Sequence, residues 1–290
     1  MALEKQSPCK VNLLLNILGK RPDGFHELET VFHPVNVCDR LTFERGGAGV
    51  QLTCSDDTLP SSSENLVYRA ATSFLTQSDI SDGVRIHLEK RLPLAAGLGG
   101  GSGNAATTLL GLNELFDSPL TAGQLNKLAS ALGSDVPFFL QSRPALATGR
   151  GELVQPLDPF PALRGAYLLL IHPGFGIATP WAYQNLARFP AALNGRPGRA
   201  AEMVSLLQQD NLEKARHVFY NSLEAPALEK FPILAIYQEF LREQGAATAL
   251  MSGSGSTTFA IFESQFAIEQ VVERFKAKFG AINWLAVVPV

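Results

Sequence analysis

The sequence predicts an α+β protein built from two lobes, and three observations lead to this prediction. The chain has 290 residues, which is long for a single hydrophobic core. Alternating apolar patterns, typical of strands, are interspersed with helical patterns along its length. A proline-rich joint at 156–161 precedes a strand pattern at 166–171, so we expect lobes at 1–157 and 158–290.

The composition argues against several classes of protein. Hydrophobic residues make up 46% of the chain and charged residues 18%, so we expect a sizeable core rather than disorder. The net charge of −3 provides no basic field, which favours a small-molecule partner over nucleic acid or a membrane. The first ten residues lack an apolar signal core, and no apolar run reaches the roughly 20 residues of a membrane span.

Cysteine and histidine usage argues against disulfides and against a histidine-built metal centre. Cys9, Cys38 and Cys54 are odd in number, widely spaced and without a C-x-x-C pair. The histidines show no H-E-x-x-H spacing. We therefore expect a cytoplasmic protein.

The first strand is expected over residues 9–18. Val11, Leu13, Leu15 and Ile17 share one face by their alternation, whereas the other face contains a lysine and two asparagines, Lys10, Asn12 and Asn16. That polar face indicates either the border of a polar cleft or an edge strand with one side in solvent.

The next hundred residues alternate between strand, turn and helix patterns. Residues 19–24 are turn chemistry, followed by an extended pattern at 25–32 and short strands near 41–44 and 50–53. Ser61–Ser63 are expected to open a helix with a stripe of Leu66, Ala70 and Phe74. A further strand with Val84, Ile86 and Leu88 then leads into a glycine-rich stretch.

The glycine-rich stretch, at 97–103, contains five glycines and directly precedes a helical pattern. Without β-carbons, its backbone amides can approach an anion closely, and a following helix N-terminus adds a favourable dipole. Ser102 or Asn104 is the expected N-cap of a helix whose face is Ala105, Leu109, Leu112 and Phe116. The stretch matches neither G-x-x-x-x-G-K-[ST] nor G-x-G-x-x-G. It indicates a nucleotide-phosphate site of another type, the alternative being a turn required only for close packing.

An aspartate follows the next helix at a constrained position. Thr121 and Gln124 form a capping box for a helix that ends at Leu132, before Gly133. Pro137 is expected to force the preceding residue into an extended conformation, which would place Asp135 at a corner before an apolar strand. From the pattern alone Asp135 is either a structural cap or a catalytic carboxylate, the cap being favoured.

The remainder of the chain predicts a second mixed region. We expect an exposed loop at 190–199, helices over 200–243, and two strands within 246–262 that flank a glycine and serine turn at 253–256. An amphipathic helix with Ile268, Val271, Val272, Phe275 and Phe279 precedes a last strand at 284–288.

These motifs, in this order, resemble the GHMP kinase superfamily. The segments that carry the resemblance are 7–13, 21–28, 92–106, 132–137 and 251–255, and the R-P-D-G-F-H-E-L run at 21–28 narrows it to the branch that acts on 4-diphosphocytidyl-2-C-methyl-D-erythritol in non-mevalonate isoprenoid synthesis. The resemblance implies a ribosomal-protein-S5-like N-terminal lobe, a ferredoxin-like C-terminal lobe and an active site in the cleft between them.

The implied activity is transfer of the ATP γ-phosphoryl group to a substrate hydroxyl, with Mg²⁺ bridging phosphate oxygens. By similarity, Asp135 takes the hydroxyl proton and Lys10 beside it stabilises negative charge. Asn65 is a possible contact on the adenine side. The implied ATP-binding loop comprises Pro93, Leu94, Ala95, Ala96, Gly97, Leu98, Gly99, Gly100, Gly101, Ser102, Gly103 and Asn104.

The implied substrate contacts lie elsewhere in the sequence. Two aromatic faces can enclose a pyrimidine ring, and Tyr183 is favoured over Trp181 as one of them. The contacts implied by the resemblance are Asn12, Phe25, His26, Phe32, Thr179 and Tyr183. The metal ligands are not identified, and a monomer or weak homodimer is expected.

Three positions depart from the pattern of the family. Cys9 replaces the usual alanine, Gly103 stands where serine is commoner, and Phe25 replaces the commoner tyrosine. The alternatives are a homoserine or mevalonate-type GHMP kinase, or a catalytically silent protein of this fold that binds a metabolite.

Overall fold

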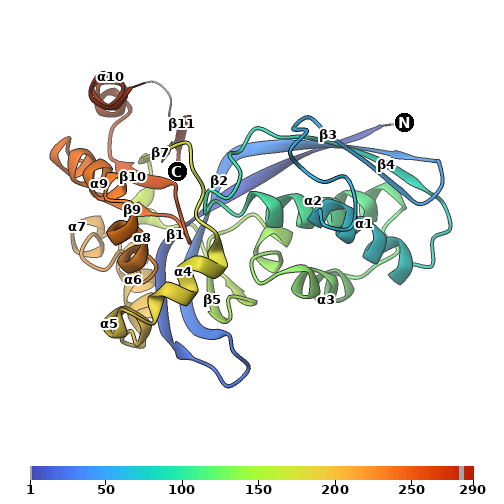
Figure 1. Ribbon diagram of the computed structural model, residues 1–290, viewed down its shortest axis with the longest axis horizontal. Helices are drawn as coiled ribbons and strands as arrows, with labels where there is room; N and C mark the ends of the chain where they lie inside the picture. Colours follow the sequence, from blue (N-terminus) through green and yellow to red (C-terminus); the bar gives the residue numbers. More distant parts are fainter. Residues whose placement is uncertain (1, 281–283) are drawn as a thin grey trace. The chain divides into compact units, whose positions relative to one another are not determined.

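The computed structural model describes residues 2–280 and 284–290 and divides into two compact units (Figure 1). Unit 1 contains the residues up to Cys9 together with Asn36–Leu92 and Gly99–Ser142. Unit 2 contains Lys10–Val35, Pro93–Leu98 and the chain from Arg143 onward. Both units are assembled from segments distant in sequence, and a lobe boundary at 157 stays a prediction.

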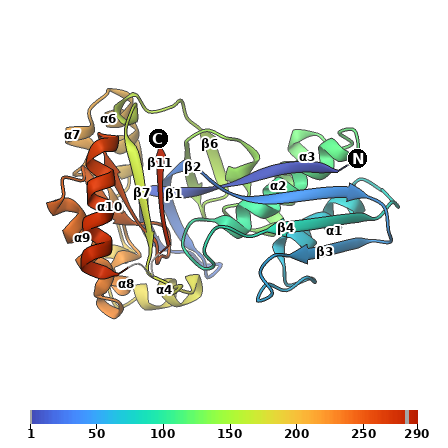
Figure 2. The ribbon, with the colours of Figure 1, turned by 90° about the horizontal axis from the view of Figure 1, so that it is seen from above.

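Unit 1 combines a layer of strands with helices. Its strands are the first part of β1 (Leu3–Lys20), the second part of β2 (His26–Arg45), β3 (Val50–Cys54) and β4 (Val84–Glu89). β4 pairs antiparallel with β2, and β3 pairs parallel with β4. The helices α1 (Leu66–Gln77), α2 (Gly100–Leu115) and α3 (Ala122–Leu132) lie on one side of these strands (Figures 1 and 2).

Unit 2 contains strands of two sheets. In the first, β1 pairs parallel with β8 (Tyr220–Asn221), while β5 (Ala145–Gly149) pairs antiparallel with β2 and with β6 (Leu153–Pro156). The second has the order β11-β7-β10-β9, formed by Trp284–Pro289, Tyr167–His172, Thr258–Phe262 and Thr248–Met251. Every neighbouring pair in this second sheet is antiparallel.

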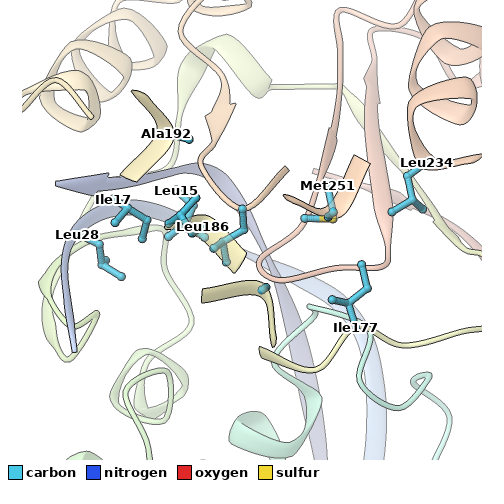
Figure 3. Close-up of a cluster of buried hydrophobic side chains, with 11 residues drawn as sticks. Leu15, Ile17, Leu28, Ile177, Leu186, Ala192, Leu234 and Met251 are labelled. Atoms are coloured by element: carbon cyan, nitrogen blue, oxygen red, sulfur yellow. The ribbon is translucent and has the colours of Figure 1, made fainter. Parts of the chain in front are cut away.

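Seven α-helices occur among the described residues of unit 2, and they pack its two hydrophobic clusters. They are α4 (Thr179–Leu186), α5 (Pro190–Leu193), α6 (Arg199–Gln208), α7 (Leu212–Ala215), α8 (Glu224–Lys230), α9 (Ile233–Glu243) and α10 (Gln265–Phe279). One cluster joins β1 and β2 to α4, α8 and the end of β9, and Leu15, Leu28 and Met251 are among its members (Figure 3). The other packs Tyr237, Phe240 and Phe275 against the second sheet.

The structure confirms most of the expected elements. The strand at 9–18 is part of β1, and its polar residues Lys10, Asn12 and Asn16 are buried, so the interpretation as a solvated edge strand is wrong. The capping box of α3, the strands flanking 253–256, the amphipathic helix α10 and the last strand are confirmed. The pattern at 41–44 is the end of the long strand β2 rather than a separate strand.

Two helix starts differ from the prediction. The side chain of Asn65 caps α1 by accepting from the amide of Val67, so the helix begins after Ser61–Ser63. Helix α2 begins at Gly100, inside the glycine run, with Gly99 as N-cap in the left-handed region. Ser102 and Asn104 therefore lie within the helix, because glycine reaches a left-handed cap conformation without steric cost.

The expected strand after Asp135 is absent from the described structure. Val136 is helical (φ −63°, ψ −41°), and Pro137–Leu140 form a 3-10 helix with proline at its first position. The amide of Val136 donates to Gly133 O at 3.2 Å and that of Phe139 to Val136 O at 3.1 Å. These successive turn bonds outweigh the extended preference of a residue before proline.

The segment at 190–199 is mostly exposed, as predicted, but it is not a simple loop. It includes α5 and the buried Ala192, and it is bonded to β1 and β2. Gly195 N donates to Ile17 O at 2.7 Å, and Gly198 N donates to a carboxylate oxygen of Glu29 at 3.1 Å. Tertiary bonds thus order a segment whose composition is typical of a loop.

No helix among the described residues has both the length and the apolar character needed to cross a membrane.

Candidate active site

Lys10 is buried on β1 and its ammonium group is oriented by neighbours in unit 2. It is 3% exposed and donates to the side-chain oxygen of Asn12 and, at 3.1 Å, to Gly97 O. The ammonium lies 5.3 Å from the ring centre of Phe32, which is itself buried. Phe32 thus contacts the lysine, and the geometry brings three predicted site residues and the glycine loop together.

Asn12 is held from both ends of its amide. Its oxygen accepts from Lys10, and its nitrogen donates to Thr30 Oγ1 at 2.8 Å. Thr30 in turn donates to Leu14 O at 2.5 Å. This chain of bonds across β1 and β2 determines the orientation of the Asn12 amide. It also gives both polar atoms of this buried side chain a hydrogen-bond partner.

We call residues 93–104 the glycine loop. Its first half, residues 93–98, is held in place by hydrogen bonds to its carbonyl oxygens. Four successive carbonyls accept bonds within unit 2: Ala95 O from Ile177 N (3.4 Å), Ala96 O from Thr257 N (3.1 Å), Gly97 O from Ser252 Oγ (3.0 Å) and Leu98 O from Lys10 N (3.0 Å). The carbonyls are therefore committed to protein donors.

Gly97 is required by this arrangement. It adopts φ +75°, and a β-carbon there would lie 2.0 Å from Ser252 O. The preceding Ala95 also has a positive φ of 50°. Backbone strain of this kind clusters at functional sites, where the surrounding structure enforces it.

The amides of consecutive residues in the loop form a row, in sequence, of available donors. Within the part of the chain that the structure describes, no amide from Leu94 to Ser102 donates to a protein acceptor. Backbone amides of folded proteins are otherwise paired in the great majority of cases. The last members of the row are in the first turn of α2, where amides have no intrahelical acceptor and the helix dipole favours an anion.

Gly103 and Asn104 differ in role from the residues before them. Gly103 N donates to Gly99 O at 2.8 Å, so its amide is part of the helix. A β-carbon on Gly103 would lie 2.6 Å from Pro8 O, which explains glycine at this departure from the family pattern. Asn104 is buried, and its amide donates to Ser7 Oγ and to Asp39, each at 2.9 Å.

Asp39 is a residue that the sequence analysis missed. It is fully buried on β2 and accepts from the amides of Arg91 (2.8 Å) and Leu92 (2.9 Å), from Asn104 and from the ammonium group of Lys90. These bonds join the chain entering the glycine loop to helix α2. No local pattern around Cys38-Asp39-Arg40 distinguishes it from a surface aspartate.

Asn65 and Asp135 both lie in unit 1. The Asn65 amide is committed within the protein, since it caps α1 and donates to Pro60 O at 2.8 Å. Asp135 is half-buried between α3 and the 3-10 helix. Lys10 belongs to unit 2, and the two predicted catalytic residues are thus described in separate units. Cys9, also in unit 1, is fully buried as a small apolar side chain would be.

All the predicted substrate contacts lie in unit 2, and two of them, His26 and Tyr183, are in contact. The rings of His26 and Tyr183 lie 5.0 Å apart, while Trp181 packs against Phe231 and Lys230. Phe25 is 51% exposed. Burial, and then the charge of Lys20, lower the pKa of His26, which favours a neutral imidazole with one donor and one acceptor nitrogen.

The turn at 253–256, here called the second glycine turn, is held by hydrogen bonds with polar residues that the sequence analysis did not select. Asn221 is buried and donates to Met251 O (2.8 Å) and Gly253 O (2.7 Å). Glu224 accepts from Met251 N (2.7 Å) and from Gln238 (2.6 Å). Thr179 Oγ1 lies 2.9 Å from Ser254 Oγ, so this predicted substrate contact also meets the turn.

Comparison with known proteins identifies the family. The N-terminal and C-terminal domain models of the GHMP kinases match residues 65–143 and 189–281. A relative from Citrifermentans bemidjiense named 4-diphosphocytidyl-2-C-methyl-D-erythritol kinase is 38% identical over 269 residues, covering 91% of each chain. The chain belongs to the 4-diphosphocytidyl-2-C-methyl-D-erythritol kinase family. It is an enzyme of the phosphotransferase class, and the predicted GHMP kinase fold is confirmed.

Solved structures of two different kinases have backbones similar to this chain but differ in their sequence identity to it. A crystal structure of a 4-(cytidine 5'-diphospho)-2C-methyl-D-erythritol kinase is 35% identical and has a TM-score of 0.78, covering 99% of this chain and 100% of that one. A homoserine kinase from Cytophaga hutchinsonii has a TM-score of 0.77, covering 99% and 93%, at only 20% identity. The two backbones resemble this chain equally, so the fold alone does not select a substrate.

Proposed function

We propose that this chain transfers the γ-phosphoryl group of ATP to the 2-hydroxyl of 4-diphosphocytidyl-2-C-methyl-D-erythritol. The observation that carries the proposal is the row of available amides from Leu94 to Ser102, in a chain 38% identical to a kinase named for this substrate. Phosphoryl transfer depends mainly on positioning and on neutralising charge, and a row of amides beside a helix N-terminus supplies both for a triphosphate.

The nucleotide donor binds along the loop from Pro93 to Ser102. The carbonyl bonds of Ala95–Leu98 keep the backbone in place before ATP arrives, so little reorganisation is needed on binding. The side chains of Asn65 and Asn104 are already hydrogen-bonded within the protein. We therefore assign them a structural role at the ATP site rather than direct contact with ATP. Gly103 contributes close packing rather than an amide.

Asp135 and Lys10 perform the chemistry in this proposal. Asp135 accepts the proton of the acceptor hydroxyl as general base, so that the oxygen can attack the γ-phosphorus. Lys10 stabilises the negative charge on that oxygen and on the transferred group. The bonds of Lys10 to Asn12 and Gly97 support this role because they orient the ammonium group.

Mg²⁺ belongs to the proposal as a companion of ATP. No group of three or more His, Cys, Asp or Glu side chains placed to hold a metal occurs among the described residues. Mg²⁺ commonly retains waters and binds phosphates with only one or two carboxylates, which fits this chain. The metal would neutralise charge on the phosphates, and the protein supplies the amides that position them.

The substrate's pyrimidine end is assigned to Phe25, His26 and Tyr183, with Asn12, Phe32 and Thr179 on the path toward Lys10. The neutral imidazole of His26 can both donate to and accept from a pyrimidine edge. A homoserine or mevalonate-type substrate has no planar ring and would leave this aromatic group unused. That difference favours the cytidine-bearing substrate.

The proposal also covers the setting of the enzyme. We propose a cytoplasmic kinase, monomeric or weakly dimeric, with lobes at 1–157 and 158–290. The two family matches lie on either side of that boundary and support it.

Release of ADP in a coupled assay tests the function. We expect release that depends on 4-diphosphocytidyl-2-C-methyl-D-erythritol and is absent with homoserine or mevalonate. Release with none of the three would instead favour a silent metabolite-binding protein.

Two substitutions test the assigned roles. Asp135→Asn should lower kcat by about 100-fold or more with ATP still bound, because no base accepts the proton. Lys10→Met should lower kcat to a similar extent with little change in ATP affinity. Asp158→Asn, at an exposed ion pair with Arg143, is the control and should leave kcat unchanged. A normal kcat in Asp135→Asn would exclude it as the base.

A further inference from the structure

Phe25 is an exposed aromatic ring on a rigid backbone. Half of the side chain is exposed, yet its carbonyl accepts from Arg21 N at 2.7 Å and its amide donates to the Asp23 carboxylate at 3.1 Å. Arg21 is further bonded to the carboxylates of Asp23 and Glu27. These bonds restrain the backbone of the turn that presents the ring of Phe25 to solvent.

One face of that ring is covered by Arg150. The guanidinium carbon lies 4.6 Å from the ring centre of Phe25. Arg150 comes from the turn between β5 and β6, where its own amide donates to Glu152 at 2.6 Å and its side chain pairs with the same carboxylate. The guanidinium group of Arg150 is therefore paired with Glu152 and also lies over the ring of Phe25.

Because Arg150 lies over one face of this half-exposed ring, we take the opposite face as the one that receives a ligand. His26, the next residue, is paired with Tyr183, so an aromatic and hydrogen-bonding group adjoins the platform. A cation over an aromatic face is attracted to the ring, so Arg150 favours one orientation of Phe25. A planar guanidinium is suited to this because it stacks on aromatic faces.

We propose that Arg150 is a positioning residue for substrate specificity: by stacking on one face of Phe25, it keeps the other face oriented as the platform for the pyrimidine ring of the substrate. This inference rests on the proposed function and deepens it. Arg150 acts through Phe25 and does not touch the reacting atoms, so its removal should affect the binding of the cytidine end and leave the phosphoryl transfer step unchanged.

Steady-state kinetics of Arg150→Leu tests the inference. We expect KM for the cytidine substrate to rise by about 3- to 5-fold, the worth of one exposed cation–π contact, with kcat and KM for ATP unchanged. Arg150→Lys should restore part of the loss because an ammonium group over the ring face also makes a cation–π contact. The dissociation constant of CDP, measured by calorimetry, should change by the same factor.

A double-mutant cycle with Phe25→Leu separates positioning from a structural role. In the Phe25→Leu background, Arg150→Leu should cause no further rise in KM, because there is no ring to orient. Arg45→Leu is the matched control: Arg45 stacks on Phe116 at 4.7 Å and pairs with Asp117, in unit 1. It should leave KM unchanged.

The outcomes are distinguishable. If the wild-type chain phosphorylates the cytidine substrate but Arg150→Leu keeps its KM, or loses kcat instead, the inference is wrong and the proposed function stands. Additive effects of Arg150→Leu and Phe25→Leu also overturn it. If the wild-type chain gives no substrate-dependent ADP release, the proposed function fails and the inference fails with it.

Discussion

Asp39 and Glu224 perform the same structural task in two regions of the molecule, by different means. Each accepts a backbone amide at the start of a glycine segment: Asp39 from Leu92 before the glycine loop, and Glu224 from Met251 before the second glycine turn. Asp39 is fully buried and is paired with the ammonium group of Lys90. Glu224 is partly buried and bonds to neutral donors.

The difference concerns charge. The four donors to Asp39 include a cation, so a carboxylate can be held inside unit 1. Loss of hydration on burial raises the pKa of Glu224 to about 7, since its bonds to Met251 and Gln238 and the nearby Arg242 offset only part of that cost. One glycine segment is held by a compensated charge and the other by a carboxyl group that is largely protonated below pH 7.

Removing the cation from Asp39 should have the largest effect on stability. Lys90→Met leaves a buried carboxylate without its charged partner, and we expect a loss of about 3–5 kcal/mol in the free energy of unfolding. Urea denaturation measures it. The same substitution at Lys276, whose pair with Glu273 is exposed, should cost less than about 1 kcal/mol. If both substitutions lowered the free energy of unfolding equally, the buried pair of Asp39 with Lys90 would be no more important than an exposed one.

The pH dependence of stability should reveal Glu224. Its pKa is raised in the folded state from the usual 4.5, so between about pH 4.5 and 7 the native state binds more protons than the unfolded state. Stability should therefore fall as pH rises through this window, by about 1–3 kcal/mol, and level off above pH 7. Glu224→Gln should remove this contribution and be more stable than the parent at pH 8, but not at pH 4.5. A variant with the parent's pH profile would contradict the assignment.

The smallest effects should come from the side-chain amides that donate to the two carboxyl groups. Asn104→Ala removes a bond to the charged Asp39 together with one to Ser7, and should cost about 1.5–3 kcal/mol. Gln238→Ala at pH 6 removes a bond to a mainly neutral carboxyl together with one from Arg242, and should cost about 0.5–1.5 kcal/mol. Thermal unfolding of the two variants side by side provides the test. The reverse order would show that the charge states are not as described.

Sequence periodicity predicted the elements whose residues repeat on one face. β1, β4, α3 and α10 were found where alternation or helical spacing placed them, since burial of one face determines those patterns. The predictions failed where local signals competed with turn geometry. Gly99, not Ser102, caps α2, and the turn bonds around Val136 outweighed the effect of Pro137.

The supporting residues of the site were beyond reach of the sequence. Asp39 meets Lys90 and Asn104 across 51 and 65 positions of chain, and neither distance leaves a local pattern. The glycine loop and the resemblance selected Lys10, Asn12 and Gly97, which the structure brings together in unit 2. The hydrogen bonds that hold each glycine segment in place could not be predicted from any motif, because they join residues that are far apart in the sequence.

The parallel pairing of β1 with β8 has a consequence for the order in which the chain is made. Ile17 N bonds to Ser222 Oγ, 205 residues later, and Leu15 O accepts from Ser222 N. At about 5–20 residues per second, a ribosome needs roughly 10–40 s to synthesise that interval. The strand that contains Lys10 and Asn12 is thus translated long before the segment that completes its hydrogen bonds. Until then its open edge is a site at which a nascent chain is vulnerable to aggregation.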